Sequence, residues 1–252
     1  MTTPKQLLQR LDDIAQSLKE SGHGRMLIGL GSVGFEHERL DEYSDLDFFA
    51  VVEEGWKGSF IVDLAWLNRA SRVAWSFQNT ADGYKLLFED GIYAEFAVFE
   101  PQELAHIPFK AGRVVWAAEG VDHQLAVPVM PLPVREERST EYLLGEALSN
   151  LYVGLGRFRR GEKLSAFRYI QGYAVDRVLE LAGRMEPAQV VSNDEFTLER
   201  RCEARFPELA RALPALMPGY EAAPQAARQI LALLEAHFTV DAVIKARIEE
   251  LM

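Results

Sequence analysis

Three prolines within six residues divide this sequence into two parts with different patterns. The segment Pro128–Pro133 reads PVMPLP. Proline interrupts both a helix and a central strand, because it lacks a backbone N–H and has a fixed φ. Before this segment short apolar runs alternate with turn residues, whereas after it apolar residues recur at helical spacing. We therefore predict an α+β chain with two domains, residues 1–130 and residues 131–252.

The first domain is predicted to combine a mixed β-sheet with flanking helices. Pro4 follows the candidate cap Thr3, and apolar residues recur every three or four positions up to Leu18, which predicts an opening helix. A further helix is expected near Ile61–Leu67. Strands are expected where apolar or alternating runs are bounded by turn residues, at residues 26–30 and 46–53, and two or three more among residues 73–78, 84–89 and 92–100.

The second domain is predicted to be a bundle of about five helices. The clearest apolar stripes run from Tyr142 to Leu155 and from Ala166 to Leu181. Weaker helical patterns cover residues 198–206, 226–238 and 240–251.

Composition and charge exclude several classes of protein. The 252 residues are 48% hydrophobic and 10% aromatic, which excludes a disordered chain. No apolar run is long enough for a membrane span, the first helix contains acids and is no signal peptide, and the single cysteine excludes an internal disulfide. The net charge is −11, and residues 1–130 carry 20 acidic against 11 basic side chains. We therefore expect a cytoplasmic protein with no membrane or nucleic-acid partner, since nucleic-acid phosphates need a basic surface.

Carboxylates stand at unusual places in two of the predicted strands. Asp45 and Asp47 open the strand at 46–53, and side chains two residues apart on a strand point to the same face, with Cα atoms about 6.6 Å apart. Glu95 stands alone within an apolar strand. Such carboxylates are costly without a positive partner, and a pair of Mg²⁺ ions suits them because Mg²⁺ prefers oxygen ligands. All three acids are therefore candidate metal-ligating and catalytic residues.

A phosphate-binding turn is predicted just before this acidic cluster. Gly31 follows the first strand and lets the backbone approach a phosphate closely, and Ser32 adds a hydroxyl and an N–H donor. Together with Asp45, Asp47 and Glu95, this turn indicates a phosphoryl-transfer site. Glu95 would also take the proton from an attacking hydroxyl.

The same residues allow other interpretations. Residues 29–34 have the form G-x-G-x-x-G of a dinucleotide-binding fold, but residues 35–44 offer too few apolar positions for its crossover helix. Asp45 and Asp47 would be ordinary surface acids if the strand start is solvated, and Glu95 if its strand lies at a sheet edge. The five histidines show no metal-binding spacing, so a zinc site is not expected.

A basic cluster in the second domain leaves two readings open. It comprises Arg157, Arg159, Arg160, Lys163 and Arg168. Such a cluster is typical of a solvated helix end, and the alternative is that one of these side chains reaches the triphosphate. Tyr142, Glu146, Tyr152 and Tyr173 could line an acceptor pocket, although packing within the bundle is the favoured interpretation for each.

The combined pattern resembles the DNA-polymerase-β-like nucleotidyltransferase superfamily, in which a Gly-Ser pair, an Asp-x-Asp pair and a later strand carboxylate recur. Within it the chain is similar to the lincosamide nucleotidyltransferases. The shared features are Tyr43–Phe48, the strand with Glu95-Phe96, the helix Tyr142–Leu151 and Arg160-Gly161-Glu162. The resemblance implies a nucleotidyltransferase sheet domain and then a helical bundle. It implies that Asp45, Asp47 and Glu95 are metal ligands, and that Gly31 and Ser32 hold phosphate.

The resemblance also implies an activity. The expected enzyme transfers a nucleoside monophosphate from an NTP, with ATP favoured, to a hydroxyl of a small molecule and releases pyrophosphate, using two Mg²⁺ ions. A lincosamide or aminoglycoside antibiotic is the implied acceptor. The segment Val33–Glu38 departs from the family, because it is apolar and acidic where members often carry a basic or small residue. A catalytically weak nucleotide-binding or toxin–antitoxin-like interaction module, transfer to a protein hydroxyl, and a homodimer all stay open.

Overall fold

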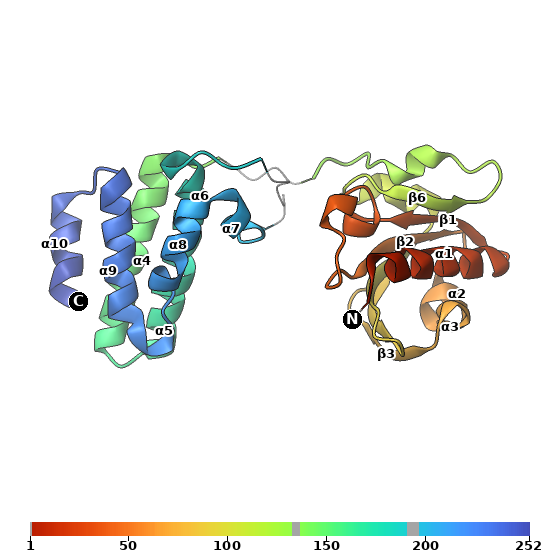
Figure 1. The fold of residues 1–252 in the computed structure, drawn as a ribbon, viewed down its shortest axis with the longest axis horizontal. Coiled ribbons are helices and arrows are strands. Elements are labelled where there is room, and N and C mark those ends of the chain that lie inside the picture. The colour runs from red at the N-terminus through yellow and green to blue at the C-terminus, as the bar shows by residue number, and fades with distance from the viewer. Residues whose placement is uncertain (1, 133–136, 191–196) are drawn as a thin grey trace. The chain divides into compact units, whose positions relative to one another are not determined.

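The chain consists of two compact units, residues 1–135 and residues 136–252 (Figure 1). The computed structural model describes residues 2–132, 137–190 and 197–252, so that Pro133 of the predicted boundary segment lies outside the described residues. The first unit contains a mixed sheet with helices, and the second is helical. The predicted α+β class is confirmed.

A six-stranded sheet, counted over the described residues, forms the centre of the first unit, with strand order β3-β4-β5-β2-β1-β6. The strands are β1 (Gly24–Gly29), β2 (Leu46–Val52), β3 (Val73–Gln78), β4 (Gly83–Phe88), β5 (Tyr93–Phe99) and β6 (Arg113–Ala117). Only β2 and β5 pair in parallel among these strands, and the other neighbours are antiparallel. The sheet is therefore mixed, as predicted.

Helices cover one face of this sheet (Figure 1). They are α1 (Pro4–Glu20), α2 (Lys57–Val62) and α3 (Ala65–Ala70). Thr3 caps α1 in a capping box with Gln6, which satisfies backbone donors at the helix start. Apolar side chains of α1, including Leu7, Leu11 and Ile14, pack against strand residues such as Phe48. Alternate residues of β2 and β5 belong to this core, so the residues between them point to the opposite face of the sheet.

A smaller apolar cluster covers part of the opposite face. It contains Met26, Ile28, Val51, Phe99, Leu104, Phe109 and Ala126. Two short 3₁₀ segments, Pro101–His106 and His123–Ala126, contribute to it. Both β2 and β5 enter this cluster near their ends, through Val51 and Phe99, whereas the predicted site acids stand near their beginnings.

The second unit is built around α4, which contacts α5, α6, α9 and α10. Its helices are α4 (Thr140–Arg159), α5 (Lys163–Phe167), α6 (Val175–Met185), α7 (Cys202–Arg205), α8 (Pro207–Leu216), α9 (Ala223–His237) and α10 (Ala242–Leu251). A π-helical segment, Arg168–Ala174, joins α5 to α6. The predicted stripes from Tyr142 and from Ala166 both lie in helices and supply buried residues to one core.

Three local predictions differ from the structure. The helix expected near Ile61–Leu67 is two short helices, because Asp63 adopts an extended conformation between them. Strand β6 was not predicted, since all five of its residues are half-buried and show no apolar alternation. Helix α8 was also missed, and it contains Pro214, which argues locally against a helix.

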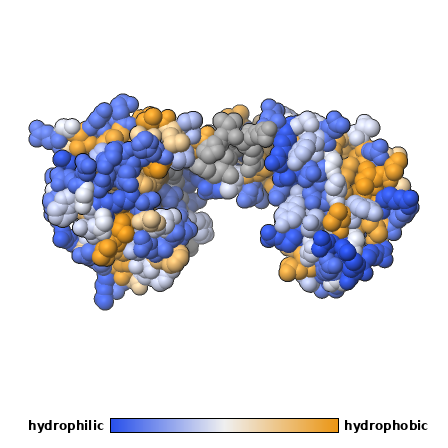
Figure 2. Space-filling view, turned by 180° about the vertical axis from the view of Figure 1, so that it is seen from behind, coloured by the Kyte–Doolittle hydropathy of each residue, from blue (hydrophilic) through white to orange (hydrophobic). Residues whose placement is uncertain are grey.

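The surface of each unit is mixed. Figure 2 shows hydrophilic side chains over most of the visible face, with apolar patches between them on both units. Among the described residues, no helix combines the length and the apolar character needed to cross a bilayer.

Candidate active site

The parallel pairing of β2 with β5 brings two of the predicted acids together. Asp47 and Glu95 are direct partners in the register of these strands. Adjacent strands lie about 4.8 Å apart, and partners in register point to the same face. Both side chains are half-buried, on the face opposite to the helices. The two carboxylates therefore lie side by side.

Asp45 belongs to the same cluster. It stands one residue before β2, where Leu46 pairs with Ala94, so Asp45 lies beside Tyr93. Its negative charge is one of the influences that raise the pKa values of Tyr93 and Lys85, after larger contributions from burial for Tyr93 and from Glu95 for Lys85. Asp45 is thus close to both side chains.

Glu95 has two neighbours that the sequence analysis did not identify. Lys85 on β4 is its register partner and places Nζ 2.7 Å from Oε1 of Glu95. The hydroxyl of Tyr93 donates to the same Oε1 at 3.3 Å. Lys85 and Glu95 are each 37% exposed at the side chain. The predicted third acid therefore lies beside the other two and is bound to an ammonium group.

The Gly31–Ser32 turn lies against Asp47. A 3₁₀ turn, Gly31–Val33, follows β1 directly, and the amide of Leu30 donates to the backbone carbonyl of Asp47 at 2.8 Å. Gly31 has φ +51°, a conformation that favours glycine, and a Cβ at this position would lie 3.6 Å from Oδ2 of Asp47. Ser32 is half-buried in the same turn. The structure thus places both predicted turn residues beside the acidic cluster.

Arg113 on β6 holds this turn and was also missed by the sequence analysis. Its Nε and Nη2 donate to the backbone carbonyl of Val33 at 3.2 and 3.1 Å. The two bonds come from one rigid guanidinium and so restrict both the position and the direction of the carbonyl. Arg113 is therefore a positioning residue for the turn.

Replacing Arg113 by alanine should loosen the turn. The amides of Gly34 and Glu36 both donate to the carbonyl of Gly31, and we expect their hydrogen exchange to accelerate by about tenfold, since a hydrogen bond to a charged group contributes on the order of 1.5 kcal/mol. Exchange measured by NMR tests this. Arg72→Ala, which removes an exposed arginine paired with Glu89, is the matched control. Equal exchange rates in the wild type and Arg113→Ala would contradict the anchoring role.

Two acids of the loop after the turn, Glu36 and Asp41, have partners close by. Glu36 forms ion pairs with Arg39 and, at 3.5 Å, with Lys110. Further along, the hydroxyl of Ser44 donates to Oδ1 of Asp41 at 3.0 Å, which closes the loop just before the site acids. Glu36 is thus paired with cations within the loop or next to it, and Asp41 accepts a hydrogen bond from the same loop.

The donor set fits Mg²⁺ in part. The described residues include no group of three or more His, Cys, Asp or Glu side chains that could hold a metal ion. In nucleotide-dependent enzymes, however, Mg²⁺ is usually held by one or two carboxylates together with substrate phosphates. Asp45 and Asp47 fit that pattern, whereas Glu95 binds Lys85. The assignment of all three acids as metal ligands stays a prediction.

The Lys85–Glu95 pair should persist to alkaline pH. The hydrogen bond and the charge of Glu95 raise the pKa of Lys85 above its ordinary 10.5. Because the folded-state pKa is the higher one, the contribution of the pair is complete below pH 10.5 and is lost as the pH rises through the folded value. The ¹³Cε resonance of Lys85 should titrate with a higher midpoint in the wild type than in Glu95→Gln. Equal midpoints would contradict the pairing.

The basic cluster of the second unit has partners within that unit. Arg157 pairs with Glu162 at 2.9 Å, and Lys163 pairs with Glu221 at 2.5 Å. A hollow of about 530 Å³ lies beside them, lined by Gly161, Glu162, Lys163, Leu164, Ser165, Arg168, Tyr169, Tyr173 and Tyr220. Whether one of these cations reaches a triphosphate stays a prediction.

The three tyrosines assigned to bundle packing are on the surface. Tyr142, Tyr152 and Tyr173 are all exposed, so the packing interpretation was wrong for them. Arg138 lies over the ring of Tyr142, and Arg168 over that of Tyr173, at 5.4 and 5.9 Å from the ring centroids.

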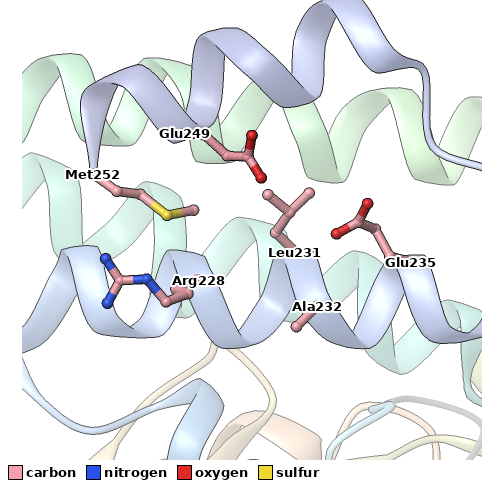
Figure 3. A pocket seen from close by; sticks show the side chains of 6 residues that line it. All are labelled: Arg228, Leu231, Ala232, Glu235, Glu249 and Met252. Carbon is pink, nitrogen blue, oxygen red and sulfur yellow. The ribbon is translucent and has the colours of Figure 1, made fainter.

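A second hollow, of about 340 Å³, lies between α9 and α10 (Figure 3). Its lining consists of Arg228, Leu231, Ala232, Glu235, Glu249 and Met252. Lys245 forms ion pairs with both Glu235 and Glu249. Glu235 and Glu249 are therefore paired within the unit. The residues that line this hollow stand on helices, without a turn or paired strands like those around Asp47.

Comparison with known proteins gives structural likenesses at low identity. No protein-family model matches the chain, and no curated protein matches its sequence. The chain is similar to the crystal structure of an aminoglycoside 6-adenyltransferase from Bacillus subtilis, with a TM-score of 0.41 and 11% identity over 100% of this chain and 98% of the other. It is also similar to a nucleotidyltransferase-like protein from Exiguobacterium sibiricum, with a TM-score of 0.31 and 12% identity over 89% and 74%. At these values neither likeness assigns an activity or a substrate to this chain.

Proposed function

We propose that this chain is a Mg²⁺-dependent nucleotidyltransferase that transfers a nucleoside monophosphate from an NTP to a hydroxyl of a small molecule. The observation that carries the proposal is the register of Asp47 with Glu95 on two parallel strands, next to the Gly31–Ser32 turn. Adjacent carboxylates beside a turn that can take a phosphate suit phosphoryl transfer.

The nucleotide side of the reaction uses the turn and the first two acids. Gly31 leaves room for a phosphate close to the backbone, and Ser32 adds a hydroxyl donor. Mg²⁺, held by Asp45 and Asp47, would offset the negative charge of the triphosphate. Arg113 keeps the turn in place through its two bonds to Val33.

The acceptor side uses Glu95. The acceptor oxygen forms a bond to the α-phosphorus while the bond from that phosphorus to the bridging oxygen of the β-phosphate breaks. Pyrophosphate leaves with the electron pair, and the acceptor proton passes to Glu95. The side-chain hydrogen bonds from Lys85 and Tyr93 to the carboxylate of Glu95 both end on Oε1, so Oε2 is the atom assigned to accept the proton.

A pyrophosphate-release screen tests the proposal. The four NTPs are each combined with pools of hydroxylated antibiotics, including lincosamides and aminoglycosides, and with metabolite pools, in Mg²⁺ or in EDTA. We expect one combination to release pyrophosphate and to add the mass of a nucleoside monophosphate to the acceptor, and EDTA to abolish both. Labelled NTP added to a protein lysate separates transfer to a protein hydroxyl from transfer to a small molecule.

Nucleotide binding without efficient transfer is the second candidate function. The pairing of Glu95 with Lys85 favours it, because the acid assigned to take the proton is already bound to a cation. This candidate predicts that calorimetry detects NTP binding in Mg²⁺ while every combination in the screen stays silent. Pyrophosphate release with any acceptor would exclude it.

A further inference from the structure

Cross-strand pairing arranges side chains in two rows on the face of the sheet that carries the site acids. The first row takes one residue from each of four strands, namely Phe77, Lys85, Glu95 and Asp47. Because neighbouring strands lie about 4.8 Å apart, Phe77 is about 14 Å from Asp47 across the sheet. The row therefore leads from the proposed reaction centre to the edge strand β3.

The second row runs beside the first and is largely apolar. It consists of Trp75, Leu87 and Tyr93. Asp45, one residue before β2, lies next to the inner end of this row. The first row is thus mostly polar and the second mostly apolar, and both begin at the acidic cluster.

The outer ends of the two rows are aromatic and exposed. Trp75 and Phe77 are 50% and 55% exposed. Their rings are stacked, with centroids 6.4 Å apart and an angle of 24° between the ring planes. Neither residue belongs to a buried core of the first unit. Two exposed rings at neighbouring positions offer an apolar surface against which another ring can pack.

The position of these rings favours the acceptor over the nucleotide. The Gly31–Ser32 turn follows β1, on one side of Asp47, whereas β3 lies on the other side, beyond β5 and β4. In phosphoryl transfer the attacking and the leaving oxygen stand in line on opposite sides of the phosphorus. If the triphosphate lies at the turn, the acceptor therefore lies on the side of Glu95 and β3.

The spacing also sets the size and charge of the acceptor. Glu95 and Phe77 are two strand spacings apart, or about 10 Å. A hydroxyl at Glu95 and a ring over Phe77 therefore belong to a molecule about two rings long. Among the described residues of these rows, Lys85 is the only cation. It stands next to three acids, Asp45, Asp47 and Glu95, so the surface disfavours an anionic acceptor.

We infer that Trp75 and Phe77 form an acceptor platform, on which the distal ring of an uncharged or cationic two-ring molecule stacks while a hydroxyl of its proximal ring lies at Glu95. The inference rests on the proposed function for the identity of the occupant. Pairing of two copies of the chain through β3 is the competing explanation of the exposed rings, since β3 is an edge strand. A register irregularity between Val73 and Trp75 bends this edge and opposes such pairing.

A labelled tryptophan provides a test that does not depend on turnover. The chain has four tryptophans, so 5-fluorotryptophan labelling gives four ¹⁹F signals, and Trp75→Phe identifies that of Trp75. The acceptor pools of the pyrophosphate screen are added without NTP. We expect at least one pool to shift the Trp75 signal while the signals of Trp56, Trp66 and Trp116 stay in place. If no pool shifts the Trp75 signal, the platform is wrong, whether or not the chain turns over.

Kinetics with an accepted molecule separate this inference from the proposed function. Trp75→Ala and Phe77→Ala should each raise the KM for the acceptor by about tenfold, the usual effect of losing a stacking partner, while the KM for NTP stays within about twofold. Phe77→Tyr should restore most of the acceptor affinity. An unchanged acceptor KM in both alanine variants overturns the platform and leaves the proposed function standing. A shift of the Trp75 signal with no transfer supports the platform and counts against the proposed function.

Self-association gives the remaining outcome. Sedimentation at low and high protein concentration, recorded together with the ¹⁹F spectrum, should show a Trp75 signal independent of concentration. A Trp75 signal that moves with concentration as the mass doubles would show that β3 pairs two copies, and would overturn the platform.

Discussion

Replacing Asp47 by asparagine is expected to lower the rate of pyrophosphate release by at least about 100-fold while the fold stays intact. Asparagine keeps the size of the side chain but removes the charge that would hold Mg²⁺ against the triphosphate, and loss of one preorganised electrostatic contact costs about 10²- to 10³-fold in kcat. Asp47 is half-buried and lies in register with Glu95, so the neutral side chain also removes one of two adjacent negative charges. Steady-state pyrophosphate release over a range of Mg²⁺ concentrations measures the effect.

Asp12→Asn is the matched control for this variant. Asp12 lies exposed on α1, away from the acidic cluster, and the substitution makes the same change in charge. We expect its rate to equal that of the wild type. Circular dichroism of both variants checks the fold. Activity of Asp47→Asn within about threefold of the wild type would remove the proposed mechanism.

Local sequence pattern predicted the strands that carry the acids, but it missed strand β6 and with it Arg113. The alternation in residues 73–78 predicted β3, and the apolar run after Asp47 predicted most of β2. Strand β6 has no such pattern in its own sequence. It is recognised as a strand through its pairing with β1. Arg113, which stands in that strand, was therefore missed as well.

The partner of Glu95 could have been found from the sequence. The residues Glu89-Asp90-Gly91 between the two predicted strands are typical of a hairpin turn, and in a hairpin residues equally far from the centre of the turn face each other. Lys85 and Glu95 are each five positions from Asp90, and they are partners in the structure.

The register that aligns Asp47 with Glu95 cannot be predicted from a local turn. β2 and β5 are parallel and are joined through two helices and two strands, so no local turn sets their alignment. A shift of one residue would turn Glu95 to the helix-covered face. The core packing of the whole unit determines this contact, and only the structure shows it.

Phe48 gives the largest expected effect on stability. It is 1% exposed, and its ring stacks on that of Phe96 with centroids 5.3 Å apart. Truncating a buried phenylalanine removes apolar contacts and leaves a cavity, so Phe48→Ala should lower the free energy of unfolding of the first unit by about 3–5 kcal/mol. All four tryptophans lie in residues 56–116. Tryptophan fluorescence during urea unfolding therefore reports on this unit.

Phe77→Ala makes the same truncation on the surface of the same sheet. Because Phe77 is more than half exposed, its loss should change the free energy of unfolding by no more than about 0.5 kcal/mol. Phe48 follows Asp47 directly and anchors β2 to the helix-covered face, so its variant should also lose the alignment of Asp47 with Glu95 as the strand loosens. Equal losses in the two variants would mean that Phe48 does not hold β2 in place, and that the register of the site depends on other contacts.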